Sequence, residues 1–305
     1  MSTTTMLELV QQVTNELGVS TPSTVAGNTN QDVIQILALM NAVGYELLRR
    51  SQWRELTKQH AFYTEYTTTT GNWTTAARTI TGIPSTTGLD TTYQAVGTGI
   101  NQNTFIVSVD SSSQVTLSQD FASAGGTNAT VYFQKMKYSL PSDYESLVPR
   151  TMWDKSKHWE MLGPEDAQQW EWLLSGYIST GPRIRWRLLG AYFQIWPGNS
   201  TAEYLGFEYR SKAWAASSTG TAKNSFTADS DTCIYPDRLM VNATKLKYFE
   251  AKGFDTTAMY RNYIMELEAA KSLDMSSANL SFAPRPGTVL IGYDNIPDSG
   301  YGASN

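Results

Sequence analysis

Residues 139–214 constrain the fold most, because they hold most of the chain's tryptophans together with a dense set of charges and turn residues. Segments 184–188, 192–196 and 204–209 have the alternating or aromatic pattern of β-strands. The Pro-Gly-Asn sequence at 197–199 separates the last two segments and has the composition of a turn. The stretch therefore predicts a small antiparallel sheet within the main body of the protein.

The first of these strands is expected to have one apolar and one cationic face, because successive side chains of a strand point to opposite sides. The apolar set is Ile184, Trp186 and Leu188, and the cationic set is Arg183, Arg185 and Arg187. A strand does not concentrate like charges without partners. We interpret the three arginines as charge-paired, either within the chain or between subunits. A solvated face and contact with DNA are the alternatives.

Two helix signals accompany these strands. Asp143 follows a turn and is placed to accept backbone N–H groups at the start of a short helical turn that ends near Arg150. Residues 163–166 place a proline at a first helical position and acids in the first turn, so a helix is expected to begin there. Trp170 and Leu173 are expected on the apolar face of that helix.

Helical patterns also occur on both sides of the central segments. Thr5 and Glu8 form a capping box in front of an apolar periodic run that ends at Gly18. Asn30 is expected to cap a second, longer helix. Two further helical runs meet at residues 252–255, which combine a stop with a new cap and so predict a helical hairpin.

Between residues 57 and 137 the composition changes abruptly to Thr, Ser, Gly and β-branched residues, and helix signals give way to strand signals. Both ends of this segment return to helical regions, so it is expected to be an inserted domain. The predicted fold class is α+β: a helical body, made of the N-terminal helices and a C-terminal helical hairpin, with an inserted β-rich domain and an extended C-terminal tail. The expected divisions are the N-terminal helical part of the body (1–56), the inserted β domain (57–137), the rest of the body with short helices, a small sheet and the hairpin (138–275), and the tail (276–305).

The segment 276–305 has too many prolines and glycines for regular structure, yet it is rich in apolar side chains. A solvated linker does not need such side chains, so we expect the segment to be ordered only when it binds another chain or a neighbouring subunit. The side chains expected to make that contact are Phe282, Val289, Leu290, Ile291, Tyr293 and Tyr301.

The composition argues against several classes of function. A net charge of −5 does not favour electrostatic binding of DNA by the whole chain. The single cysteine, Cys233, excludes an internal disulfide and is interpreted as a small buried hydrophobe. His60 and His158 lie in different expected domains, and neither has the spacing of a metal ligand. No catalytic residue, cofactor or metal site is predicted, and the chain is not expected to be an enzyme.

The series LPSDYESLVPRTMWD, a W-x-x-L-G-P segment, GPRIRWRLLG, an aromatic strand and EYRSKAW is similar to the head-to-tail connector (adaptor) proteins of short-tailed, podovirus-type bacteriophages. The N-terminal helices and the helical C-terminal part follow the same pattern, so the resemblance covers nearly the whole chain.

This resemblance implies a structural protein of the virion, located at the head–tail interface and made in the host cytoplasm. It implies a twelve-fold ring of identical copies that joins the portal to the tail tube or nozzle, with a tail fibre as a possible further partner. DNA would pass through the channel of the ring without sequence-specific binding. The apolar residues of the tail would then contact the portal or a neighbouring subunit.

A carbohydrate- or receptor-binding tail protein is the alternative function. The inserted β segment and the aromatic residues suggest it, although the tryptophans are spread over helix and strand positions, where packing in the core and at interfaces is their more ordinary role. The assembly state separates the two functions, because an adaptor is expected to form a ring with the portal, whereas receptor-binding proteins of phages are commonly trimers.

Overall fold

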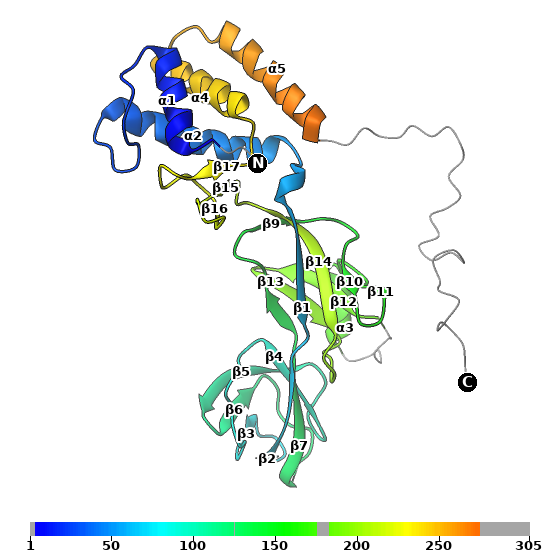
Figure 1. Ribbon diagram of the computed structural model, residues 1–305. Coiled ribbons are helices and arrows are strands. Elements are labelled where there is room, and N and C mark those ends of the chain that lie inside the picture. The colour runs from blue at the N-terminus through cyan, green and yellow to red at the C-terminus, as the bar shows by residue number, and fades with distance from the viewer. Residues whose placement is uncertain (1–3, 125, 176–182, 275–305) are drawn as a thin grey trace, which may run out of the picture.

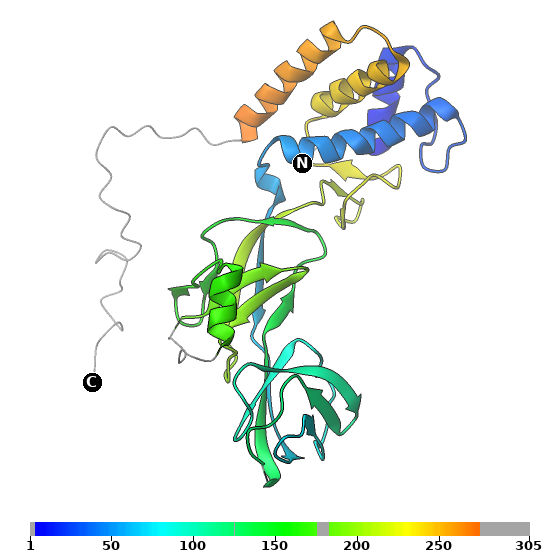
Figure 2. The same cartoon turned by 180° about the vertical axis from the view of Figure 1, so that it is seen from behind.

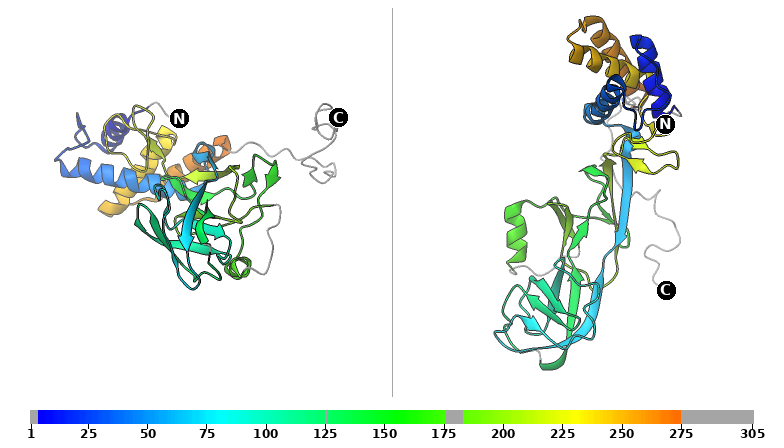
Figure 3. Two further views of the ribbon diagram at one scale, coloured as in Figure 1. Left: turned by 90° about the horizontal axis from the view of Figure 1, so that it is seen from below. Right: turned by 90° about the vertical axis from the view of Figure 1, so that its left-hand side faces the viewer.

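The computed structural model describes residues 4–124, 126–175 and 183–274. These residues form three parts in a line: a helical part at one end, a central part of two β-sheets, and a small β-barrel at the other end (Figures 1 and 3). Of the described residues, 29% are helical and 31% are in strands, in four antiparallel sheets. The prediction of a helical body with an inserted β domain is therefore wrong, because two of the three parts consist mainly of sheet.

The helical part packs four helices over a small three-stranded sheet. Its elements are α1 (Met6–Leu17), α2 (Gln31–Arg50), α4 (Asp237–Lys252), α5 (Thr257–Asp274), β15 (Ala215–Ala216), β16 (Ala222–Lys223) and β17 (Thr232–Cys233). Trp214 and Tyr235 are fully buried in its core. Gly44 of α2 allows this packing, since a Cβ at that position would lie 2.2 Å from the Trp214 ring.

The helix ends follow the local sequence signals. Thr5 and Glu8 form the predicted capping box of α1, and Gly18 ends that helix in the left-handed conformation. The side chain of Asn30 caps α2 as predicted. Gly253 ends α4 in the left-handed conformation, as Gly18 ends α1. Helix α4 is the first helix of the predicted hairpin, and α5 is the second.

The central part consists of two packed sheets and one short helix. Its elements are η1 (Arg54–Leu56), β1 (Thr57–Tyr63), β8 (Lys137–Ser139), β9 (Tyr144–Leu147), β10 (Trp153–Asp154), β11 (Trp159–Glu160), α3 (Ala167–Leu174), β12 (Arg185–Leu189), β13 (Tyr192–Trp196) and β14 (Tyr204–Ser211). One sheet has the order β1-β14-β10-β11 with β9 also paired to β14, and the other has the order β12-β13-β8. Figure 2 shows α3, in green, in front of these sheets when the molecule is seen from behind.

Aromatic rings fill the space between the two central sheets. The Phe193 ring stacks on Trp186 with centroids 5.4 Å apart and on Phe207 with centroids 5.0 Å apart. All three side chains are buried. This layer is the hydrophobic core of the central part, and it is separate from the core of the helical part.

The barrel at the far end has six strands in the order β2-β7-β4-β5-β6-β3. They are β2 (Tyr66–Trp73), β3 (Thr79–Ile80), β4 (Tyr93–Gly97), β5 (Thr104–Ser111), β6 (Gln114–Leu117) and β7 (Gly126–Lys135). The two end strands meet, because Asn72 and Thr81 exchange two backbone hydrogen bonds of 2.8 and 3.0 Å. Closure leaves the sheet without long free edges.

The segment 57–137 does not belong to the barrel alone. Its first strand, β1, pairs with β14 over its whole length, with His60 opposite Phe207. Lys137 lies at the start of β8, which pairs with β13. The local pattern of residues 57–63 does not reveal this, because the partner strand lies far along the chain.

Two local predictions in the central part are wrong. No helical turn follows Asp143; the next residues form strand β9 instead. The helix expected from residues 163–166 begins only at Ala167, because Asp166 is its cap and accepts a hydrogen bond from the Gln169 N–H at 2.7 Å. A side-chain cap at this position fixes the start of α3 more strongly than the proline does.

Candidate functional site

The central part contains a cavity of about 380 Å³, called here the Trp186 cavity. Its walls come from β9 and the segment after it, from the segment between β11 and α3, and from β12. The apolar side chains that line it are Leu147, Pro149, Met152, Met161, Pro164, Trp186 and Leu188. Arg150, Glu160, Glu165 and Arg187 supply the charged groups of the lining.

The segment before α3 is held against β12 by backbone hydrogen bonds. The Leu162 N–H donates to the Ile184 carbonyl and the Trp186 N–H donates to the Leu162 carbonyl, both at 2.9 Å. Gly163 lies between these contacts, and a Cβ there would be 2.4 Å from the Trp186 carbonyl oxygen. Only glycine therefore permits this close approach, which forms one wall of the cavity.

Trp186 is the buried polar group of the cavity. Its side chain is 4% exposed, and its Nε1–H has no hydrogen-bond partner. A buried donor without an acceptor costs about 1–3 kcal/mol. This nitrogen is itself buried, so it lies in the packed wall of the cavity and not at its open surface.

The three arginines of the predicted cationic face have different surroundings. Arg185 pairs with Glu165, with Nη1 and Oε1 2.5 Å apart. Arg187 lies over the Trp170 ring at 4.6 Å and donates to Gln194 at 3.1 Å. Burial lowers the pKa of Arg187. Arg183 is exposed.

Arg185 and Arg187 thus have partners within the chain, from three different segments. Contact of these arginines with a neighbouring subunit stays a prediction. The Glu165 carboxylate, whose side chain is 7% exposed, is the partner that sequence reasoning did not identify. Its place among acids next to a glycine and a proline suggested only the start of a helix.

The six side chains of the predicted partner contact lie outside the described residues: Phe282, Val289, Leu290, Ile291, Tyr293 and Tyr301. Their role stays a prediction. The described chain ends at Asp274, whose carboxylate accepts a hydrogen bond of 3.0 Å from the Arg54 N–H. The segment that carries these residues therefore begins where the helical part meets the central part.

Asp143 forms a second polar cluster on the central sheet. Its carboxylate accepts hydrogen bonds from Lys58 at 2.7 Å, from Tyr209 at 2.8 Å and from Ser211 at 2.7 Å. Burial alone raises the pKa of Asp143, but these hydrogen bonds outweigh it and lower the pKa to about 2. The cluster holds β1, β14 and the segment before β9 together, so its role is structural.

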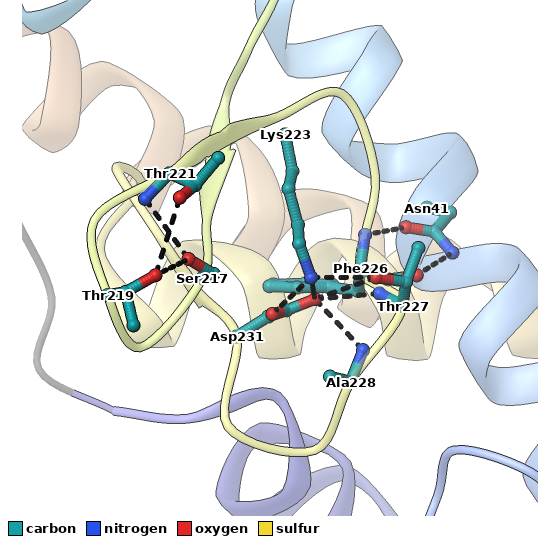
Figure 4. Close-up of polar contacts among 9 residues, drawn as sticks. All are labelled: Asn41, Ser217, Thr219, Thr221, Lys223, Phe226, Thr227, Ala228 and Asp231. Carbon is teal, nitrogen blue, oxygen red and sulfur yellow. Dashed lines mark hydrogen bonds and ion pairs between the residues drawn. The ribbon is translucent and has the colours of Figure 1, made fainter.

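A third polar cluster holds the loops of the helical part (Figure 4). The fully buried Asp231 carboxylate pairs with Lys223 at 2.7 Å and accepts the Thr227 and Ala228 N–H groups at 2.8 and 2.9 Å. Asn41 of α2 exchanges two hydrogen bonds with the Phe226 backbone. The donors around the carboxylate come from the protein itself, so the cluster fixes the loop between β16 and β17 on α2.

His60 and Cys233 occupy packing positions, whereas His158 is exposed. Burial lowers the pKa of His60, which lies between the rings of Phe62 and Phe207. His158 lies in a different segment and lines a shallow hollow beside Lys155. Cys233 is buried as predicted, and burial raises the pKa of its thiol to about 12. Such a thiol stays protonated and is a poor nucleophile.

Among residues 4–124, 126–175 and 183–274, no cluster of three or more His, Cys, Asp or Glu side chains has the arrangement of a metal site. None of the helices that the structure describes is long and apolar enough to cross a membrane.

Helix α5 carries several exposed apolar side chains. It buries one stripe, Tyr263, Leu267 and Ala270, against the other helices. Tyr260, Met265 and Leu273 are each more than half exposed. These side chains lie among exposed polar ones such as Arg261 and Glu268, so the outer side of α5 is mixed in character.

No family model matches the chain, and no curated protein is significantly similar to it. Its function is therefore inferred from its own residues and geometry.

Proposed function

We propose that this protein is a structural adaptor of a phage virion. In this proposal identical copies form a ring that joins the portal to the tail tube or nozzle and leaves a passage for DNA. The observation that carries the proposal is the arrangement of the three parts in a line, with the helical part and the barrel at opposite ends (Figures 1 and 3). A subunit of this form offers a separate surface to each of two partners.

Contacts between the central part and the barrel support a role that depends on fixed geometry. Asn103 of the barrel donates to the Leu174 carbonyl at the end of α3 at 2.6 Å. Thr64, between β1 and β2, exchanges hydrogen bonds with Glu203 of the central part. These contacts come from separate segments, so the barrel is held by more than its two connecting strands.

The charge of the chain is also compatible with a DNA passage. The whole chain carries a net charge of −5, and affinity for DNA depends mainly on cationic groups that contact phosphates. Both arginines of β12, Arg185 and Arg187, are engaged with other side chains of the same chain. In this proposal a channel wall without a net positive charge lets DNA move past without holding it.

The experiment that tests this function is the measurement of assembly. The purified chain is mixed with the portal ring of the same phage, and the mass and symmetry of the product are determined by light scattering and electron microscopy. We expect a twelve-fold ring of this chain on the portal. A stable trimer that binds polysaccharide and ignores the portal would instead support the receptor-binding alternative.

A further inference from the structure

We propose that the Trp186 cavity is the binding site for an extended apolar segment, residues 288–293, of a neighbouring copy of this chain. The inference rests on the proposed function, because it supplies a contact between adjacent copies of the ring. A segment on one copy that fits a cavity on the next is a heterologous contact, and repetition of such a contact closes a ring when the rotation permits it.

The cavity has the size and chemistry of a site for apolar side chains. Its volume of about 380 Å³ lies within the range of binding pockets in proteins, about 300–1,000 Å³. Its lining is mostly aliphatic, with Met152, Met161 and Leu188 among the contributors. Methionine side chains adapt their shape, so such a lining accepts an apolar chain better than it accepts a charged one.

Trp186 forms a rigid wall of the cavity. Its ring is fixed by stacking on Phe193 with centroids 5.4 Å apart, and its indole N–H is buried in that wall. A rigid aromatic wall beside adaptable methionine side chains suits the apolar side chains of an extended segment.

The C-terminal segment of the chain has the matching composition. Residues 288–293 read Thr-Val-Leu-Ile-Gly-Tyr, with Arg285 before them and Asp294 after them. The lining of the cavity carries charges of both signs, Arg150 and Glu160. The positive charge of Arg285 therefore has a negative partner in the lining, and the negative charge of Asp294 has a positive one.

The length of the chain allows this contact between copies. The described chain ends at Asp274, which is attached to Arg54 at the junction of the helical and central parts. The residues from there to position 288 span about 45 Å when extended, at about 3.3 Å each. That distance is larger than the width of a domain of about a hundred residues, so the segment reaches beyond its own central part.

A photo-crosslinking experiment on the full chain tests the site. One batch carries benzoylphenylalanine in place of Tyr293 and natural nitrogen; the second batch is unsubstituted and labelled with ¹⁵N. The two are mixed before assembly, irradiated and analysed by mass spectrometry. We expect crosslinks to residues 147–152, 161–164 or 186–188, with light and heavy partners in about equal amounts.

Two substitutions at neighbouring positions of β12, one in the cavity lining and one outside it, provide matched variants. Leu188→Asp introduces a charge into the lining and is expected to abolish the crosslink, whereas Leu189→Asp, on the exposed neighbouring position, leaves it. Circular dichroism verifies that both variants are folded.

Each outcome decides one of the two proposals. Crosslinks to other segments, crosslinks with light partners alone, or a ring without crosslinks would overturn the cavity as a site for a neighbouring copy. A ring without crosslinks leaves the adaptor function intact. Crosslinks between copies in an assembly that never forms a ring with the portal would instead support the site and contradict the adaptor function.

Discussion

Trp186 combines a packing role with an unpaired donor. Its ring belongs to the aromatic layer between the two central sheets, while its N–H faces no acceptor. The alternation along residues 183–188 is enough to predict its burial, and helical spacing predicts the burial of Trp170 and Leu173. All three side chains are buried as predicted. The cavity beside Trp186 could not be predicted, since its walls come from segments that are distant in sequence.

Substitution of Trp186 by alanine is expected to destabilise the protein by about 3–5 kcal/mol, because truncation of a buried tryptophan loses its packing and leaves a cavity. Urea unfolding followed by circular dichroism measures this change. Trp172→Ala is the matched control, since Trp172 is 49% exposed on α3. We expect the control to change stability by less than about 1 kcal/mol. Equal effects of the two substitutions would contradict the assignment of Trp186 to the buried face of β12 and of Trp172 to the exposed face of α3.

Asp143 shows where local interpretation fails. An aspartate after a turn resembles a helix cap, and the residues beside it carry no sign of its actual partners. Lys58 and Ser211 lie 85 and 68 positions away along the chain. Only the pairing of β1 with β14 brings these groups to one carboxylate.

The Asp143 cluster is expected to make stability depend on pH. The folded-state pKa, about 2, lies below the ordinary value of 3.8, so the stabilisation is complete above about pH 4 and is lost as the pH falls toward 2. Asp143→Asn is expected to cost about 2 kcal/mol at pH 7 and almost nothing at pH 2. Urea unfolding of both proteins across this range measures the difference. A difference that stays constant with pH would show that the charge of Asp143 is not the cause.

Helices and strands differ in how far the sequence determines them. The caps at Thr5, Asn30 and Gly253 act within a few residues, so α1, α2 and α4 could be predicted with their ends. Strands β12, β13 and β14 could be predicted as strands because their alternating or aromatic pattern is also local. Their partners could not, because β1 and β8 carry no local mark of the sheet to which they belong. The fold class was predicted wrongly at this point, since the central part was assigned to a helical body.

The strand pairing distinguishes two deletions. Residues 66–135 contain only the six strands of the barrel, and the ends that remain are adjacent, because the Lys135 N–H donates to the Glu65 carbonyl at 2.9 Å. Replacing residues 66–135 by a short Gly-Ser linker is expected to leave the helical and central parts folded. Deleting residues 57–137 also removes β1 and exposes the edge of β14, so that product is expected to aggregate or unfold.

Circular dichroism and size-exclusion chromatography compare the two products. Retention of helix and a monodisperse peak for the shorter deletion alone is the expected result. If both products fold equally well, β1 is dispensable for the central sheet. If neither folds, the barrel stabilises the central part through contacts such as that between Asn103 and Leu174.

At the scale of the whole molecule, the junctions between parts determine what the chain can transmit. At one junction Glu65 accepts hydrogen bonds from Tyr93 and Lys135, each at 2.9 Å, and its own N–H donates to Tyr138. At the other, Arg54 is bonded to the last residue of α5. The three parts are thus connected by polar contacts as well as by the chain, which suits a subunit that holds two partners at a fixed separation.

The C-terminal segment is expected to act in assembly and not in the folding of the free chain. Deletion of residues 276–305 removes all six side chains expected to contact a partner but retains Asp274 and its hydrogen bond with Arg54. A segment so rich in proline and glycine has few backbone hydrogen bonds of its own without a partner, so the thermal unfolding midpoint of the free chain is expected to stay unchanged. Binding to the portal is expected to be lost, because the side chains that make the contact are gone. Calorimetry of the free chain and cosedimentation with portal rings measure the two effects separately. Unchanged portal binding would show that the adaptor contact lies elsewhere, and a lowered midpoint would show that the segment packs on its own chain.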